Sequence, residues 1–123
     1  MACLVFCEDE GSIRRLIEVA LRSTPHEVHL AADGAEGLAL AERLRPDAVF
    51  TDLRMPKLDG LQLRDALAAR PALAGIPVAV ITASAQRGDL EEVRASGVSA
   101  VLLKPFSPLA LRELVERVLA GAH

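Results

Sequence analysis

The sequence predicts an α/β fold built on a doubly wound, parallel, five-stranded sheet of the (βα)5 type. Short apolar runs alternate strictly with segments whose apolar residues recur at helical spacing. No linker, repeat or low-complexity stretch interrupts the 123 residues, and 51% of them are hydrophobic, which is enough for one packed core. Only the second apolar run alternates with polar residues, as an edge strand does. These observations favour the flavodoxin-like strand order 2-1-3-4-5.

The first three elements are predicted from a change of period along the chain. Residues 2–7 form a continuous apolar run, which is typical of a strand covered on both faces. From residue 12 the apolar side chains follow the spacing of an amphipathic helix, and Pro25 ends that segment. Residues 26–32 then alternate in polarity and are predicted to form the half-exposed edge strand.

The second helix is predicted from its ends. Asp33 and Glu36 have the spacing of a capping-box variant, with Asp at the N-cap and Glu at N3, and Pro46 closes the segment. Its buried face is expected to consist of apolar side chains at helical spacing, namely Leu38, Ala41 and Leu44.

The rest of the chain continues the alternation and ends in a helix. Ser107 and Pro108 supply an N-cap and the favoured N1 proline for that last helix, which is expected to run to about residue 120. The elements between them are expected as a strand over 48–52, a helix over 58–69, a strand over 76–83, a helix over 89–96 and a strand over 99–103.

Composition limits the classes of function. The formal charge of −3 without a basic face argues against direct nucleic-acid binding. No apolar run approaches the roughly 20 residues of a membrane span, and nothing resembles a signal peptide, so a cytoplasmic chain is expected. Cys3 and Cys7 lie about 13 Å apart along one strand, too far to bridge, and are expected to be unpaired thiols. The whole chain, residues 1–123 with a core over 3–120, is expected to be one domain without an output module, either stand-alone or excised from a longer protein.

Charged and polar residues collect where the predicted strands end. Glu8 and Asp9 follow the first strand, Asp52 the third, Thr82 ends the fourth, and Lys104, one of two lysines, follows the fifth. In a sheet of this order these strand ends meet at the ligand-binding edge. Clustered carboxylates need a cation, and the acids favour Mg²⁺ (or Mn²⁺), which prefers oxygen ligands, over zinc.

This set of residues suits phosphoryl transfer to a carboxylate. An Asp can attack phosphorus and form an aspartyl-phosphate, provided that a metal and further donors neutralise the phosphoryl oxygens. Asp52 is the expected nucleophile, with Glu8 and Asp9 holding the metal, Lys104 as a second cation and Thr82 as a hydroxyl donor. The anionic loop after the first strand disfavours a preformed flavin or dinucleotide site.

The segments "CEDE", "DLRMPKLDG", "VAVITASA" and "LLKPF", in this order and spacing, resemble the receiver domain of two-component response regulators, including chemotaxis regulators. The resemblance implies that Asp52 accepts a phosphoryl group from a sensor histidine kinase or a histidine phosphotransfer protein. It implies Mg²⁺ held by Asp9, Asp52 and the backbone carbonyl of Arg54, with Glu8 acting through water. It also implies a cis peptide before Pro105, and no enzymatic activity beyond self-phosphorylation and slow autodephosphorylation.

The same resemblance raises a question about signal output. In the family the Thr/Ser hydroxyl moves toward the phosphoryl group and an aromatic side chain then rotates, which remodels the face of helix 4, strand 5 and helix 5 that binds a downstream protein. Thr82 is present, but the aromatic position is Val101, a small and stiff side chain. Either the domain switches with altered coupling, which we favour, or it is a phosphate sink, a relay or a phosphorylation-independent interaction module. Arg54 and Ser84 flank the expected path of the hydrolytic water, and the chain is expected to be a monomer or a weak homodimer.

A phosphatase of the haloacid dehalogenase type is a weaker alternative, because its nucleophilic Asp follows the first strand and a second Asp comes two residues later. Here the candidate follows the third strand and position 54 is Arg.

Overall fold

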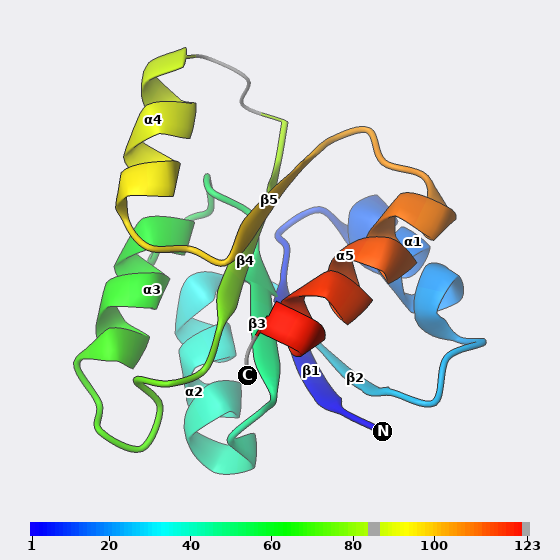
Figure 1. Cartoon of the computed structure of the whole chain (residues 1–123), viewed down its shortest axis with the longest axis horizontal. Coiled ribbons are helices and arrows are strands. Elements are labelled where there is room, and N and C mark those ends of the chain that lie inside the picture. The colour runs from blue at the N-terminus through cyan, green and yellow to red at the C-terminus, as the bar shows by residue number, and fades with distance from the viewer. Residues whose placement is uncertain (84–86, 122–123) are drawn as a thin grey trace.

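The computed structural model describes residues 1–83 and 87–121, apart from the side chains of residues 87–90. Strands and helices alternate along the whole described chain, as the sequence predicts (Figure 1). The strands are β1 (Cys3–Cys7), β2 (Glu27–Ala31), β3 (Ala48–Thr51), β4 (Val78–Thr82) and β5 (Ala100–Leu103). The helices are α1 (Gly11–Leu21), α2 (Gly34–Leu44), α3 (Gly60–Ala68), α4 (Arg87–Ala95) and α5 (Pro108–Gly121).

The five strands form one parallel sheet in the order β2-β1-β3-β4-β5, so the predicted fold class and strand order are confirmed. The half-polar strand β2 is at an edge, and the mostly apolar, buried strands β1, β3 and β4 are central. In the register, Cys7 is opposite Thr51, so the residues that follow β1 and β3 emerge side by side.

Helices cover both faces of the sheet, α1 and α5 on one and α2, α3 and α4 on the other (Figure 1). On the α1 and α5 face, the rings of Phe6 and Phe50 stack with centroids 4.5 Å apart and planes inclined by 11°. These two rings are paired residues of the adjacent strands β1 and β3, and both are almost fully buried. Stacked aromatic pairs add stabilisation beyond the apolar area that they bury.

The buried face of α2 differs from the prediction. Gly34, Gly37 and Ala41 are buried, whereas Leu38 and Leu44 are only partly buried. The helix lies so close to β1 that a Cβ atom at Gly37 would be 2.2 Å from the Cys7 Sγ atom. Glycine therefore forms the contact surface, and the leucines lie at its margin.

The helix ends follow their caps closely. Asp33 accepts a hydrogen bond from Glu36 N as predicted, but the Glu36 carboxylate accepts from Ala32 N, one residue before the N-cap. Helix α3 begins at Gly60, two residues later than expected, because Asp59 forms a complete capping box with Gln62. Ser107 caps α5 by accepting from Ala110 N. The expected inward position of Leu90 lies outside the described side chains.

Across residues 1–83 and 87–121, none of the helices has the length and apolar character needed to cross a membrane.

Candidate functional site

The candidate site is at the carboxyl edge of the sheet, where β1, β3, β4 and β5 end. The sheet hydrogen bonds continue into it: Asp52 N donates to Cys7 O at 3.0 Å, and Lys104 N donates to Thr82 O at 2.9 Å. The backbones of Asp52 and Lys104 are therefore held by the neighbouring strands.

Three carboxylates meet at this edge. One oxygen each of Glu8, Asp9 and Asp52 lies within 4.8 Å of the others. Glu8 is 2% exposed and Asp52 8% exposed, whereas Asp9 is exposed to solvent. Two buried acids and one accessible acid thus form a pocket of negative charge that opens toward solvent at Asp9.

Lys104 lies between the two buried acids. Its Nζ atom donates to Glu8 Oε1 at 2.5 Å and to Asp52 Oδ2 at 2.8 Å, and its side chain is 10% exposed. Burial lowers the Lys104 pKa, but the hydrogen bonds and charges of Asp52 and Glu8 outweigh that effect and raise it above its ordinary value. Burial raises the pKa of Glu8, against the lowering effect of its hydrogen bond with Lys104. One cation therefore stabilises two carboxylates, and a net negative charge remains.

The backbone after β1 also fixes Glu8. Glu10 N donates to Glu8 Oε2 at 3.1 Å, and the Arg14 Nη1 atom donates to the Glu8 carbonyl oxygen at 2.8 Å. Sequence reasoning did not include Arg14 in the site. The sequence indicates this contact only weakly, through the position of Arg14 in the first turn of the helix that follows the acids.

The β3–α3 loop wraps around Asp52. Arg54 N makes a long contact of 3.4 Å to Asp52 Oδ1, and a Cβ atom at Gly60 would lie 2.5 Å from Asp52 O, so this approach requires glycine. Side chains of the loop and of Asp9 line a shallow depression beside the acids, formed by Asp9, Arg54, Met55, Pro56 and Asp59. Arg54 is exposed at the rim of this depression, and its expected position beside the path of the hydrolytic water stays a prediction.

The remaining residues singled out from the sequence lie around this edge. Thr82 is 1% exposed and ends β4, and the peptide between Lys104 and Pro105 is cis, as the resemblance implies. Val101 is opposite Val80 in the sheet and is partly buried against the cluster that includes Val80 and Val93. Ser84 lies outside the described residues.

A parallel sheet of this order, with three acids and a lysine at its carboxyl edge, has the architecture of a receiver domain. The sequence matches the response regulator receiver domain family over residues 4–116. The chain therefore belongs to the response regulator receiver domain family, whose members are signalling modules.

The individual similarities agree with this membership. The chain is 38% identical over 105 residues to the transcriptional regulatory protein PdtaR of Mycobacterium tuberculosis, which covers 85% of this chain and 50% of that protein. The chemotaxis protein CheY4 of Vibrio cholerae has a TM-score of 0.88 and 31% identity, covering 96% of this chain and 98% of CheY4.

A third relative carries a metal. The receiver domain of the sensor histidine kinase PA1611 from Pseudomonas aeruginosa PAO1 has a TM-score of 0.88 and 33% identity, covering 97% of this chain and 98% of that domain. Its structure has a magnesium ion coordinated in the active site cleft. Among the curated relatives, by contrast, this chain spans only about half of each protein's length.

Proposed function

We propose that this chain is a phosphoacceptor that takes a phosphoryl group from a phosphohistidine onto Asp52. The donor would be a sensor histidine kinase or a histidine phosphotransfer protein. The observation that carries the proposal is the convergence of Glu8, Asp9 and Asp52 within 4.8 Å, with Lys104 bound to both buried acids. Three acids beside one lysine leave an excess of negative charge, which is unfavourable in a merely structural role because like charges raise each other's cost of ionisation.

The acid group suits a divalent cation that prefers oxygen ligands. Asp9, Asp52 and the backbone carbonyl of Arg54 would hold Mg²⁺ (or Mn²⁺), with Glu8 acting through water, and the exposed side of Asp9 leaves room for water and phosphoryl oxygens. When bound, the ion would supply positive charge against the phosphoryl oxygens. The magnesium in the PA1611 receiver domain supports this choice of metal.

The contacts of Asp52 favour one of its oxygens as the nucleophile. Lys104 holds Oδ2 at 2.8 Å, whereas the contact from Arg54 N to Oδ1 is long, at 3.4 Å. We assign the attack on phosphorus to Oδ1: a bond forms between Oδ1 and phosphorus while the bond from phosphorus to the donor histidine nitrogen breaks. The electron pair of that bond returns to the imidazole. Lys104 would then pair with the new phosphoryl charge, and the Thr82 hydroxyl would donate to a phosphoryl oxygen.

Output would pass from Thr82 to the face formed by α4, β5 and α5, which would contact a downstream protein. Val101 packs beside Val80 and Val93, under α4, so it lies on this route. Because valine has one stiff side-chain torsion, the rotation that an aromatic residue makes there is absent. A phosphate sink or relay, or an interaction module with impaired switching, is therefore the second candidate function, and Val101 is the observation that favours it.

The first experiment is intact-mass spectrometry after incubation with acetyl phosphate, with and without Mg²⁺. We expect a magnesium-dependent gain of one phosphoryl group in the native chain and none in Asp52→Asn. Asp65→Asn, which neutralises an exposed acid on α3, is the matched control and should gain the group normally. A phosphoryl gain in Asp52→Asn equal to that of the native chain would refute Asp52 as the acceptor.

A second experiment separates switching from storage. Beryllofluoride, an analogue of the phosphoryl group, would be added with Mg²⁺, and amide chemical shifts would be recorded by NMR. Shifts that extend from Asp52 to α4 and β5 support a switching receiver, whereas shifts confined to the strand ends support a sink or relay. Restoring an aromatic side chain in Val101→Tyr should extend the shifts if the missing ring limits coupling.

The remaining assignments follow from this function. A receiver must share a compartment with its kinase, for which we propose the cytoplasm, and the chain would act as a monomer or weak homodimer. Direct nucleic-acid contact is not proposed for this chain. PdtaR is a transcriptional regulator, but this chain covers only half of it.

A further inference from the structure

A second group of metal-ligating side chains lies at the opposite end of the sheet from the acids. The Sγ atom of Cys3, a carboxylate oxygen of Glu27 and a ring nitrogen of His29 lie within 4.8 Å of one another. Cys3 is opposite Glu27 in the pairing of β1 with β2, and His29 is two residues further along β2. Since alternate residues of a strand project from one face, Glu27 and His29 share the face toward which Cys3 projects.

The His29 ring is the unusual member of this group. Its Nε2 atom is shielded from solvent and is the one buried side-chain nitrogen or oxygen, within the part of the chain that the structure describes, that has no hydrogen-bond partner. Glu27 Oε2 lies 3.1 Å away, close enough for contact but outside hydrogen-bond geometry. The atom therefore has one charged neighbour but no hydrogen bond, and a buried polar atom that lacks a hydrogen bond is costly unless a water molecule or an ion satisfies it.

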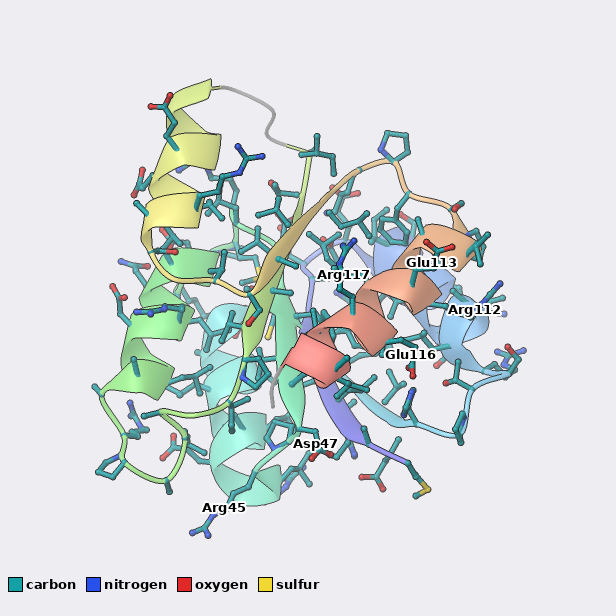
Figure 2. All side chains as sticks on the ribbon, viewed as in Figure 1. Arg45, Asp47, Arg112, Glu113, Glu116 and Arg117 are labelled. Carbon is teal, nitrogen blue, oxygen red and sulfur yellow. The ribbon has the colours of Figure 1, made fainter. Side chains whose placement is uncertain are left out.

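Charge and access both allow a cation here. The Glu27 side chain is 55% exposed and that of His29 is 29% exposed, so an ion can enter from the sheet edge. The Asp47 carboxylate accepts a hydrogen bond from Cys3 N at 2.7 Å and adds a second negative charge beside the group. Figure 2 shows Asp47 at the amino end of β3, away from the edge that carries the phosphoacceptor.

We propose that Cys3, Glu27 and His29 form a binding site for a divalent transition metal of the Zn²⁺ class. One sulfur, one imidazole nitrogen and one carboxylate oxygen are donors that zinc accepts, whereas Mg²⁺ and Ca²⁺ prefer oxygen alone. Tetrahedral zinc bonds place neighbouring ligand atoms about 3.3–3.5 Å apart, given bond lengths of roughly 2.3 Å to sulfur and 2.0 Å to nitrogen or oxygen. Side-chain rotations that move the donor atoms by about an ångström would therefore bring all three to bonding distance from one ion. The Cys3 thiol loses its proton to solvent as the metal–sulfur bond forms, and water completes the coordination.

The site would join the edge strand β2 to β1 at the amino end of the sheet. It is separate from the phosphoacceptor, since the group includes neither Glu8, Asp9 nor Asp52. The competing explanation is an ion pair between a protonated His29 and Glu27, with Cys3 as a bystander thiol. That explanation needs no metal, and it predicts no metal–sulfur bond.

Cobalt(II) is the probe that separates the two explanations, because Co²⁺ bound to a thiolate gives a charge-transfer band and intense d–d bands that carboxylate sites lack. The native chain would be titrated with Co²⁺ under reducing conditions, followed by displacement with Zn²⁺. We expect one equivalent with a thiolate band, which Zn²⁺ abolishes. Cys3→Ser should remove the band, and His29→Gln should weaken binding by more than the roughly 10–100-fold that loss of an outer-shell partner costs.

Three control variants test whether the other cysteine, another histidine or the acid site contributes to the cobalt band. Cys7→Ala removes the other cysteine, His26→Gln removes the histidine that directly precedes β2, and Asp52→Asn alters the acid site. Each of these variants should keep the thiolate band. Circular dichroism establishes that every variant is folded. Absence of the thiolate band in the folded native chain, or its persistence in Cys3→Ser, would overturn the proposal, and Co²⁺ binding that is lost only in Asp52→Asn would assign the metal to the acid site alone.

Discussion

Replacing Lys104 with Met tests whether the buried cation holds the acid group together. Methionine keeps the apolar stem and removes the charge that contacts Glu8 Oε1 and Asp52 Oδ2. Glu8 is 2% exposed and Asp52 8% exposed, so both carboxylates would be left buried beside each other without their cation. Removing one partner of a buried ion pair typically costs about 3–5 kcal/mol, a large part of the roughly 5–15 kcal/mol that stabilises a domain.

The loss should depend on pH in a defined direction. Glu8 already has a pKa raised by burial, and removing Lys104 also removes the hydrogen bond that lowers it. In the variant the folded state then binds a proton at Glu8 more readily than the unfolded state, whose carboxyl has a pKa near 4.5. The free energy of unfolding of Lys104→Met should therefore recover relative to the native chain as pH falls toward 4.5, by up to about 1.4 kcal/mol per pH unit.

Urea unfolding followed by far-UV circular dichroism measures this effect, because the sequence has no Trp or Tyr to report by fluorescence. The measurement is made in metal-free buffer at several pH values. The double variant with Glu8→Gln, which removes the uncompensated charge, should regain most of the stability at neutral pH. A Lys104→Met chain within 1 kcal/mol of the native chain at pH 7, or a loss that does not change with pH, would refute the reasoning.

Three further predictions concern the scaffold. Asp59→Ala removes the capping box of α3 and should cost about 1 kcal/mol in urea unfolding, whereas Asp65→Ala on the same helix should change stability by less than about 0.5 kcal/mol; equal losses would contradict the cap. Gly37→Ala places a Cβ atom 2.2 Å from Cys7 Sγ, and the resulting overpacking should cost about 1–3 kcal/mol and lower the midpoint of thermal unfolding. Adding Cys7→Ala should reverse most of that loss, and a midpoint that stays low in the double variant would disprove the contact. Burial raises the pKa of the Cys7 thiol to about 12, so its contribution to stability is complete below pH 9 and should be lost as pH rises from 9 toward 12. Alkylation of the native chain at pH 8 should therefore spare Cys7, and rapid labelling of Cys7 at that pH would contradict its burial.

The sheet and the strand-end positions of the acids could be predicted from the sequence because both depend on local signals. The period of the apolar residues distinguishes strand from helix, and the half-polar pattern of residues 26–32 identifies the edge strand. Given that order, the strand ends that carry Glu8 and Asp52 must be adjacent.

The contacts within the site could not be predicted in the same way. Lys104 and Glu8 are 96 residues apart in the sequence, and nothing local indicates that the lysine binds Glu8 as well as Asp52. The close approach of α2 to β1 at Gly37 depends on a distance between two elements, which hydrophobic spacing does not contain. Spacing therefore favoured Leu38 and Leu44 over the glycines.

The group at Cys3 shows a further limit. From the sequence, a cysteine in an apolar strand is predicted to be an ordinary core residue, and Glu27 and His29 are predicted to lie on the exposed side of an edge strand. Only the register, which places Glu27 opposite Cys3, brings the three side chains together. A register between two strands is a tertiary property, and no pattern within either strand specifies it.

The stacked pair of Phe6 and Phe50 has a consequence for how this domain can move. Glu8 and Asp52 each lie two residues beyond one of these rings, on strands joined by hydrogen bonds up to Asp52 N. The backbones of the two acids therefore follow strands that are joined by hydrogen bonds and by the ring stack, and moving these strand ends apart would have to disturb those contacts. We expect these two strand ends to be the stationary part of the site, so that the proposed phosphoryl group on Asp52 would be bound in the same geometry whether or not a signal is delivered.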